Sequence, residues 1–363
     1  MSANRPPPKI LVAGGGVSGL ETVLALQSLA PGWFDIDMLA PERHFVDRQP
    51  AIGAPFEPIR PDRSELSAIA EDLGFDLTRD ALDRVDAAGH EALTQGGNRI
   101  AYDVLVLALG ARPVAAVQGA LPFRGWQDAA AVEDALETIG SGPTRVAYVA
   151  RSAATWTLPL YELALQTGAW AKERDVVADV LLATAEREPL EVFGSRASRQ
   201  VADLLRAGGV RFIPNAEVDR VQDGCLRIGS EGSIRVDLAV ALPVLLGPAV
   251  TGVPQDIAGF TSVDERGRVS GLDDVYAVGD MTSRPLKQGG LAAQQADVAA
   301  RAIVASAGVP VRVQPYRPVL RATLLSGCAP LHLRNPPAED EGVAPDSQLA
   351  QYLATHGEPQ TVH

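Results

Sequence analysis

Cysteine is scarce in this chain, and its scarcity excludes several classes of protein. The 363 residues include two cysteines, Cys225 and Cys328, which cannot form a disulfide framework or a Cys-x-x-Cys redox pair. The five histidines are scattered without metal-ligand spacing, so we expect no metal site. Cysteine usage this low suggests a reducing compartment, the cytoplasm.

Long apolar runs and positive charge are also in short supply. No stretch of 18 uncharged apolar residues is present, and residues 1–8 lack the apolar core of a signal peptide. The formal net charge of −13 argues against nucleic acid and acidic membrane lipids as partners. We therefore expect a cytoplasmic protein with a small-molecule substrate and no integral membrane association. The oligomeric state, a homodimer included, stays open.

A glycine-rich turn follows a short apolar segment near the start of the chain. Residues 9–13 (KILVA) predict a strand buried on both faces, and residues 13–21 (AGGGVSGLE) lead into an amphipathic helix. Gly14 permits the tight turn, Gly16 lets a pyrophosphate approach the backbone, and Gly19 lets the helix pack on the sheet. The predicted diphosphate site consists of Gly14, Gly16, Val17, Ser18 and Gly19.

An acid at the end of the next strand is expected to bind the adenosine ribose. That strand is predicted at residues 34–39, and Glu42 follows it at the spacing typical of such an acid. Asp37 is the rival position. For either residue, a solvated acid at a strand end is the alternative.

Residues 102–113 (YDVLVLALGARP) predict a central strand, because they are almost wholly apolar up to Leu109. The strand ends at Gly110, where the chain must turn out of the sheet. We assign Ala108 and Gly110 to the cofactor-binding set.

Residues 275–297 (VYAVGDMTSRPLKQGGLAAQQAD) combine a strand, a turn and a helix. The strand ends at Gly279, and the Asp280 carboxylate is predicted to accept a hydrogen bond from a ribityl hydroxyl. A helix cap is the alternative for Asp280. Gln288 and the two glycines after it begin a helix whose free N–H groups face a flavin and stabilise negative charge on the reduced ring. The three segments together predict non-covalently bound FAD.

A separate α/β unit is predicted between the second and third segments. Its strands are expected at 144–150, 177–183 and 210–213, and its helices at 158–167 and 195–207. The predicted fold class is α/β, with two Rossmann-like dinucleotide-binding domains (glutathione reductase-like), the second inserted in the first, and a short C-terminal segment. The expected limits are 1–113 with 247–310 for the FAD-binding domain, 114–246 for the second, and 311–363 for the C-terminal segment.

The turn after the first strand of this inserted unit contains no glycine. Residues 150–156 read ARSAATW, and side chains there obstruct the close approach of a pyrophosphate. This predicts a degenerate NAD(P)H site. The alternative is that Arg151 and Ser152 bind phosphate through their side chains.

Four segments resemble those of soluble bacterial flavoproteins: WTLPLYELAL (156–165), PLEVFGSRAS (189–198), PLKQGGLAAQQAD (285–297) and YRPVLRATLL (316–325). Over about residues 8–330 the chain resembles the pyridine nucleotide-disulphide oxidoreductase superfamily, on the branch with sulfide:quinone oxidoreductases and type II NADH dehydrogenases. The resemblance implies bound FAD, two-electron flavin chemistry and a quinone-like acceptor. It implies that Glu162 faces the flavin and takes part in proton transfer, and that Arg48 and Pro50 lie in a loop over the flavin.

Two more side-chain roles are predicted from position. Lys287, just before the flavin-facing helix, would stabilise the anionic reduced flavin. Glu162 as a solvated helix residue and Lys287 as a residue without a catalytic role are the alternatives. Trp156 and Tyr161 either line the face where a substrate stacks or serve only in packing.

The chain also departs from its relatives. Sulfide:quinone oxidoreductases need cysteines beside the flavin, whereas the corresponding turn here holds Ser152 and Thr155, and Cys328 alone cannot form a polysulfide relay. We also expect no counterpart of the membrane-docking C-terminal helices of these relatives. We predict an FAD-dependent oxidoreductase that transfers two electrons between an unidentified donor and acceptor. The alternatives are an NAD(P)H:acceptor reductase of the quinone type and a non-catalytic flavin-binding redox sensor or partner protein.

Overall fold

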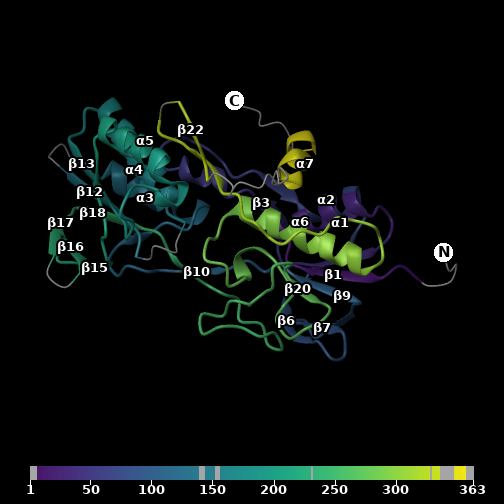
Figure 1. Ribbon diagram of the computed structural model, residues 1–363. Helices are drawn as coiled ribbons and strands as arrows, with labels where there is room; N and C mark the ends of the chain where they lie inside the picture. The colour runs from purple at the N-terminus through teal and green to yellow at the C-terminus, as the bar shows by residue number, and fades with distance from the viewer. Residues whose placement is uncertain are drawn as a thin grey trace.

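The computed structural model describes residues 6–138, 144–151, 156–229, 232–327, 329–335 and 347–356. Two parallel five-stranded sheets form two lobes that lie side by side (Figure 1). The first sheet has the order β20 (Val275–Ala277), β9 (Val104–Leu107), β1 (Lys9–Ala13), β2 (Asp35–Leu39) and β5 (Asp76–Thr78). It therefore takes strands from both ends of the chain.

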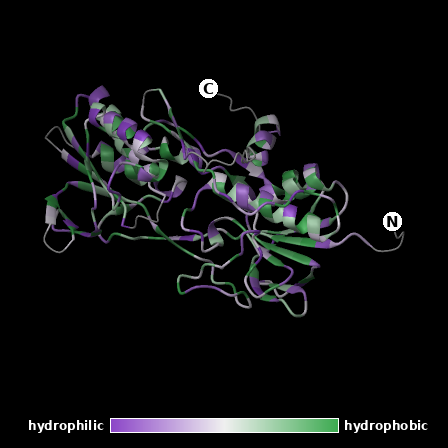
Figure 2. Ribbon diagram, in the orientation of Figure 1, coloured by the Kyte–Doolittle hydropathy of each residue, from purple (hydrophilic) through white to green (hydrophobic). Residues whose placement is uncertain are grey.

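The first sheet is covered differently on its two faces. Strand β1 lies between β2 and β9, and its residues from Ile10 to Ala13 are fully buried. One face packs on α1 (Val17–Leu29), α2 (Leu66–Leu73) and α6 (Gly289–Ser306). The other face packs on the antiparallel sheet of β6 (Leu82–Asp86), β7 (Glu91–Thr94) and β8 (Arg99–Ala101). Burial on both faces explains why these strands are almost continuously apolar, as Figure 2 shows.

The second sheet repeats this arrangement. Its order is β11 (Leu121–Pro122), β18 (Leu238–Ala241), β12 (Thr144–Val149), β13 (Ala178–Ala183) and β14 (Val210–Ile213). Helices α3 (Trp126–Glu137), α4 (Leu158–Glu173) and α5 (Ser195–Ala207) share one core with it. The opposite face packs on β15 (Val218–Gln222), β16 (Cys225–Ile228) and β17 (Gly232–Arg235). The predicted α/β class with two Rossmann-like units is confirmed.

The chain passes between the two lobes along a short antiparallel pair. Strand β10 (Arg112–Val114) pairs with β19 (Val244–Leu246), so the outgoing and returning segments run side by side. These strands lie at the predicted limits 113/114 and 246/247. The division into domains at those limits stays a prediction.

Two short antiparallel strand pairs lie outside the two main sheets. Strands β3 (His44–Val46) and β4 (Arg63–Glu65) form a hairpin-like pair, with the short 3₁₀ helix η1 (Gln49–Ile52) between them. Strands β21 (Arg321–Leu324) and β22 (Leu331–Arg334) pair beyond α6. Neither pair was predicted from the sequence.

The last described helix is α7 (Gln348–His356). It packs on α1, where the buried carboxylate of Glu21 accepts hydrogen bonds from the backbone N–H groups of Gln348 (3.1 Å) and Leu349 (3.2 Å). Glu21 thus satisfies free N–H groups at the start of α7. Among the described helices, none has the length and apolar composition needed to cross a bilayer.

Candidate functional site

The first and second predicted flavin segments meet at the end of β1. Gly14 has φ +120°, and a Cβ atom placed on it would lie 2.3 Å from the carbonyl oxygen of Ala108. The N–H of Ala108 in turn donates to the carbonyl of Ala13 at 2.7 Å. This turn therefore tolerates only glycine at position 14. Gly110, with φ +69°, lies in the turn that leads out of the sheet.

Gly16 and Gly19 differ in what surrounds them. A Cβ on Gly19 would come within 1.9 Å of the Gly14 carbonyl oxygen, so Gly19 serves the packing of α1 on the turn. A Cβ on Gly16 would meet no protein atom within 4 Å. Gly16 is the N-cap of α1 without a side-chain cap, and Val17 is the first residue of that helix. The N-terminus of α1 thus faces open space of the kind an anionic group needs.

The third segment meets the first through Ser18 and Gly279. The side-chain oxygen of Ser18 lies 2.6 Å from the place a Cβ on Gly279 would take. Three segments more than 80 residues apart in the sequence therefore form one site at the carboxyl edge of the first sheet. Open α/β sheets bind ligands at this edge.

The half-buried carboxyl group of Asp280 lies in this site without a hydrogen-bond donor among the described residues. Burial raises its pKa, and the positive charges of Lys287 and Arg48 oppose the rise. Helix α6 is capped by Gln288 instead, whose Oε1 accepts from the N–H of Leu291 at 2.9 Å. The alternative of Asp280 as a cap of that helix is therefore wrong.

Gln295 holds the turn that carries Asp280, and it was not among the residues predicted from the sequence. Its Oε1 accepts hydrogen bonds from the N–H of Gly279 (3.1 Å) and from Oγ1 of Thr282 (3.2 Å). The side chain is 6% exposed and comes from the second turn of α6. It fixes the turn relative to the helix.

The start of α6 is open on its outer side. Gly289 and Gly290 are exposed, and a Cβ on Gly289 would meet nothing within 4 Å. The side chain of Gln288 is already engaged, because its Nε2 also donates to the carbonyl of Arg321 at 3.3 Å. These two hydrogen bonds orient the Gln288 side chain away from the free N–H groups of the helix start.

Of the two acids considered for the ribose, only Glu42 stands free. Asp37 lies inside β2, and its carboxylate forms a 2.6 Å ion pair with Lys9 Nζ. Glu42 is exposed just beyond the end of the same strand. The described structure thus favours Glu42 over Asp37.

Glu162 is buried in α4, with 6% of its surface exposed. Burial raises its pKa to about 7, although its Oε1 accepts a hydrogen bond from the N–H of Leu325 at 3.0 Å. The alternative of a solvated helix glutamate is therefore wrong. Helix α4 packs against η1, which follows Arg48, and its core includes Leu291 from the first turn of α6. Glu162 thus lies on a helix of the second lobe that packs against η1 and the start of α6.

The side chain of Lys287 makes its contacts with residues of the first lobe. Its Nζ donates to the carbonyl of Thr282 and lies 4.1 Å from the centroid of the Phe260 ring. Burial lowers its pKa to about 8, and the charge of Asp280 opposes the fall. The cation is therefore placed beside the Asp280 turn.

Tyr161 serves in packing and does not face the open site. Its side chain is fully buried; its hydroxyl donates to Glu186 at 2.7 Å and accepts from the N–H of Leu190 at 3.1 Å. Glu186 also accepts from Oγ1 of Thr157 (3.1 Å) and of Thr184 (3.0 Å). Glu186 was missed, although it follows β13 just as Glu42 follows β2.

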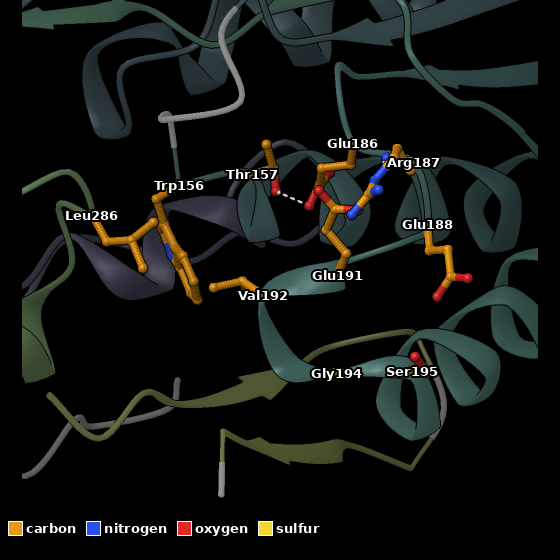
Figure 3. Close-up of a pocket in the computed structure, with 10 residues that line it drawn as sticks. All are labelled: Trp156, Thr157, Glu186, Arg187, Glu188, Glu191, Val192, Gly194, Ser195 and Leu286. Atoms are coloured by element: carbon orange, nitrogen blue, oxygen red, sulfur yellow. Dashed lines mark hydrogen bonds and ion pairs between the residues drawn. The ribbon is translucent and has the colours of Figure 1, made fainter. Parts of the chain in front are cut away.

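A cavity of about 650 Å³ opens beyond the carboxyl ends of β12 and β13 (Figure 3). Trp156 lines it and packs edge-on against Phe193, with ring centroids 5.9 Å apart. Leu286, from the segment before α6, lies on the same side as Trp156. We call this space the Trp156 cavity.

Some predicted features lie outside the described residues. Residues 152–155, which make up most of the glycine-free turn, are among them, and so is Cys328. Cys225 is a free thiol in β16, on the face of the second lobe away from α4.

These residues fit FAD. The site combines open space over Gly16, a carboxyl group of Asp280 without a protein donor, and a helix start at Gly289 without covering side chains. At the start of α1, no atom of the described residues lies within 4 Å of the place that a Cβ on Gly16 would take.

Comparison with known proteins agrees with this arrangement. The family described as pyridine nucleotide-disulphide oxidoreductase matches residues 8–302. A sulfide-quinone reductase of Aquifex aeolicus is 24% identical over 264 residues, which cover 68% of this chain and 61% of that relative. The ferredoxin–NAD(+) reductase component of the p-cumate 2,3-dioxygenase system of Pseudomonas putida is 25% identical, over 76% of this chain and 68% of that protein. The chain thus spans less than two thirds of the first relative.

Solved structures show the same fold. The sulfide:quinone oxidoreductase of Aquifex aeolicus superposes with a TM-score of 0.81 at 20% identity, over 96% of this chain and 89% of that one. A ferredoxin reductase from Rhodopseudomonas palustris gives a TM-score of 0.67 at 18% identity, over 90% and 81% of the two chains.

Proposed function

The chain belongs to the pyridine nucleotide-disulphide oxidoreductase family, and from that premise we propose that it is an FAD-dependent oxidoreductase that passes two electrons between a small-molecule donor and an acceptor. FAD is the cofactor of this family and supplies the two-electron chemistry. The observation that carries the proposal is the convergence of three distant segments around the open N-terminus of α1.

The residues of the first lobe would hold the cofactor. The backbone at Gly16 and the N-terminus of α1 suit a diphosphate. Glu42 suits the ribose hydroxyls, and the Asp280 carboxylate suits a ribityl hydroxyl. The open N-terminus of α6 and the nearby Lys287 suit negative charge on the ring.

Glu162 is proposed as the proton-transfer group. A pKa near 7 lets a carboxyl group both donate and accept a proton at neutral pH. Its hydrogen bond from the N–H of Leu325 fixes one carboxylate oxygen and leaves the other for a reacting group. Burial, which keeps bulk water from this carboxyl, supports the assignment.

One alternative has a specific observation in its favour. The relative from Pseudomonas putida is named a ferredoxin–NAD(+) reductase component, which favours use of a nicotinamide dinucleotide. Against it stands the glycine-free sequence of residues 150–156, whose side chains obstruct the close approach of a pyrophosphate. Glu186 follows β13 at the spacing of a ribose-binding acid and is no argument against a dinucleotide.

Anaerobic stopped-flow spectroscopy of the FAD-loaded protein tests both proposals. Donors are mixed with the protein one at a time, and bleaching of the oxidised flavin is followed. We expect rapid bleaching by an organic or sulfur donor and slow or no bleaching by NADH and NADPH. Fast reduction by micromolar NADH would favour the alternative, and no reduction by any donor would favour the redox sensor.

A further inference from the structure

The Trp156 cavity has two chemically different ends. At one end, Trp156, Val192 and Leu286 present apolar surface (Figure 3). Leu286 directly precedes Lys287 and the helix start that faces the proposed flavin site. Through Leu286, the apolar end is adjacent in sequence to the residues of the proposed redox centre.

The other end is acidic. Glu186, Glu188 and Glu191 line it, and among the described residues Arg187 is the one basic side chain in this wall. Arg187 is already engaged with Glu191, whose Oε2 lies 3.4 Å from its Nε and accepts from its backbone N–H at 3.3 Å. A phosphate group entering this end would meet the carboxylates of Glu188 and Glu191 and, within the part of the chain that the structure describes, a single cation, the exposed Arg187 paired with Glu191. The start of α5, at Gly194 and Ser195, also lines the cavity.

The acidic wall is built rigidly. Leu190 adopts φ +48°, which is unfavourable for a leucine, and the Tyr161 hydroxyl accepts its N–H. Glu186 is fixed by three hydroxyl donors, from Thr157, Tyr161 and Thr184. Such a preformed wall of fixed polar groups beside an aromatic ring is typical of small-molecule sites.

We propose that the Trp156 cavity binds an uncharged or cationic aromatic molecule in preference to an anionic one. The ring would pack against Trp156 and Leu286, and its hydroxyl or ammonium group would point to Glu188. This site would be the substrate site of the oxidoreductase. The assignment of the cavity as the substrate site rests on the proposed function, whereas the preference for uncharged and cationic ligands does not.

Three probes of matched size test the preference: cationic tyramine, neutral para-ethylphenol and anionic para-hydroxyphenylacetate. Their binding to the FAD-loaded protein is measured by titration calorimetry. We expect tyramine to bind about tenfold more tightly than para-hydroxyphenylacetate, with para-ethylphenol between them, because each charge interacts with the acidic end through a partly screened medium. Trp156→Ala should weaken all three.

A charge-reversal variant distinguishes the effect of the carboxylates in the cavity from the effect of the overall negative charge of the chain. Glu188→Lys should reverse the order of tyramine and para-hydroxyphenylacetate. Glu173→Lys changes net charge equally, but Glu173 is exposed at the far end of α4, about 24 Å along a helix of 16 residues from the cavity end, and should leave the order unchanged.

Equal binding of the two charged probes would overturn the inference, and so would an order that survives Glu188→Lys. Binding of no probe, or binding indifferent to Trp156→Ala, would also overturn it. The flavin absorbance band of the same samples reports the proposed function separately. A protein without that band that still binds the probes in the expected order would refute the proposed function alone.

Discussion

Replacing Glu162 by glutamine is predicted to remove a pH-dependent loss of stability. Burial raises the pKa of this carboxyl from 4.5 to about 7 in the folded protein. The folded state therefore holds the proton more tightly than the unfolded state. The free energy of unfolding falls as the pH rises from about 4.5 through 7, because the folded chain must then keep a buried charge.

The magnitude follows from the size of that rise. At about 1.4 kcal/mol for each pKa unit, the buried charge costs about 3 kcal/mol at pH 8. Glutamine has nearly the same volume, can still accept from the N–H of Leu325, and carries no charge. Glu162→Gln should therefore match the wild type near pH 4.5 and exceed its stability by up to about 3 kcal/mol at pH 8.

Thermal and urea unfolding of the FAD-loaded proteins between pH 5 and pH 8 provide the assay. Glu173→Gln, an exposed site on the same helix, is the matched control and should follow the wild type at every pH. Parallel stability curves for Glu162→Gln and the wild type across this range would show that Glu162 is not a buried ionisable group. The reasoning about its role would then fail as well.

Three other predictions concern the same site. Glu162→Gln should retain FAD but slow turnover by about 10²–10⁴-fold with a good donor, and full activity would place the proton path elsewhere. Asp280→Ala should weaken FAD binding by about 1.5–3 kcal/mol in a calorimetric titration, whereas an unchanged affinity would show that its carboxylate serves no ribityl hydroxyl. Gln295→Met removes the acceptor for Gly279 and Thr282, and should lower both FAD affinity and the free energy of unfolding, the latter by about 1–3 kcal/mol. Unchanged values of both would contradict the positioning role of Gln295.

The sequence predicted those parts of the fold that depend on local pattern. The strands at β1, β13 and β14 and the helix α5 appear within a residue or two of the expected limits, because apolar runs and glycine turns mark them. Helix α4 extends to Glu173, beyond the expected end at 167. Its last turns bury Trp170 and Ala171 against the second lobe, which local pattern does not reveal.

The sequence revealed less of the site, for a physical reason. Gly14 and Gly19 were predictable because their close contacts involve backbone that any glycine-rich turn brings together. The contact of Ser18 with Gly279 depends on how α1 and α6 pack across more than 250 residues of chain, whereas the hydrogen bonds of Gln295 depend on how the turn after β20 folds back on α6. No periodicity within either helix encodes them. Glu186 did have a signal, since an acid after a second strand is the pattern that identified Glu42.

Reconstitution of the FAD-free protein with FAD, for the wild type and Gly16→Val, tests the central claim most directly. The backbone at Gly16 has φ −85°, and a Cβ there meets no protein atom within 4 Å, so valine is compatible with the fold itself. We expect the wild type to bind FAD stoichiometrically, and Gly16→Val to unfold at the same temperature as the FAD-free wild type yet to bind no FAD. Binding of FAD by Gly16→Val with unchanged affinity, or no binding by the wild type, would contradict the central claim.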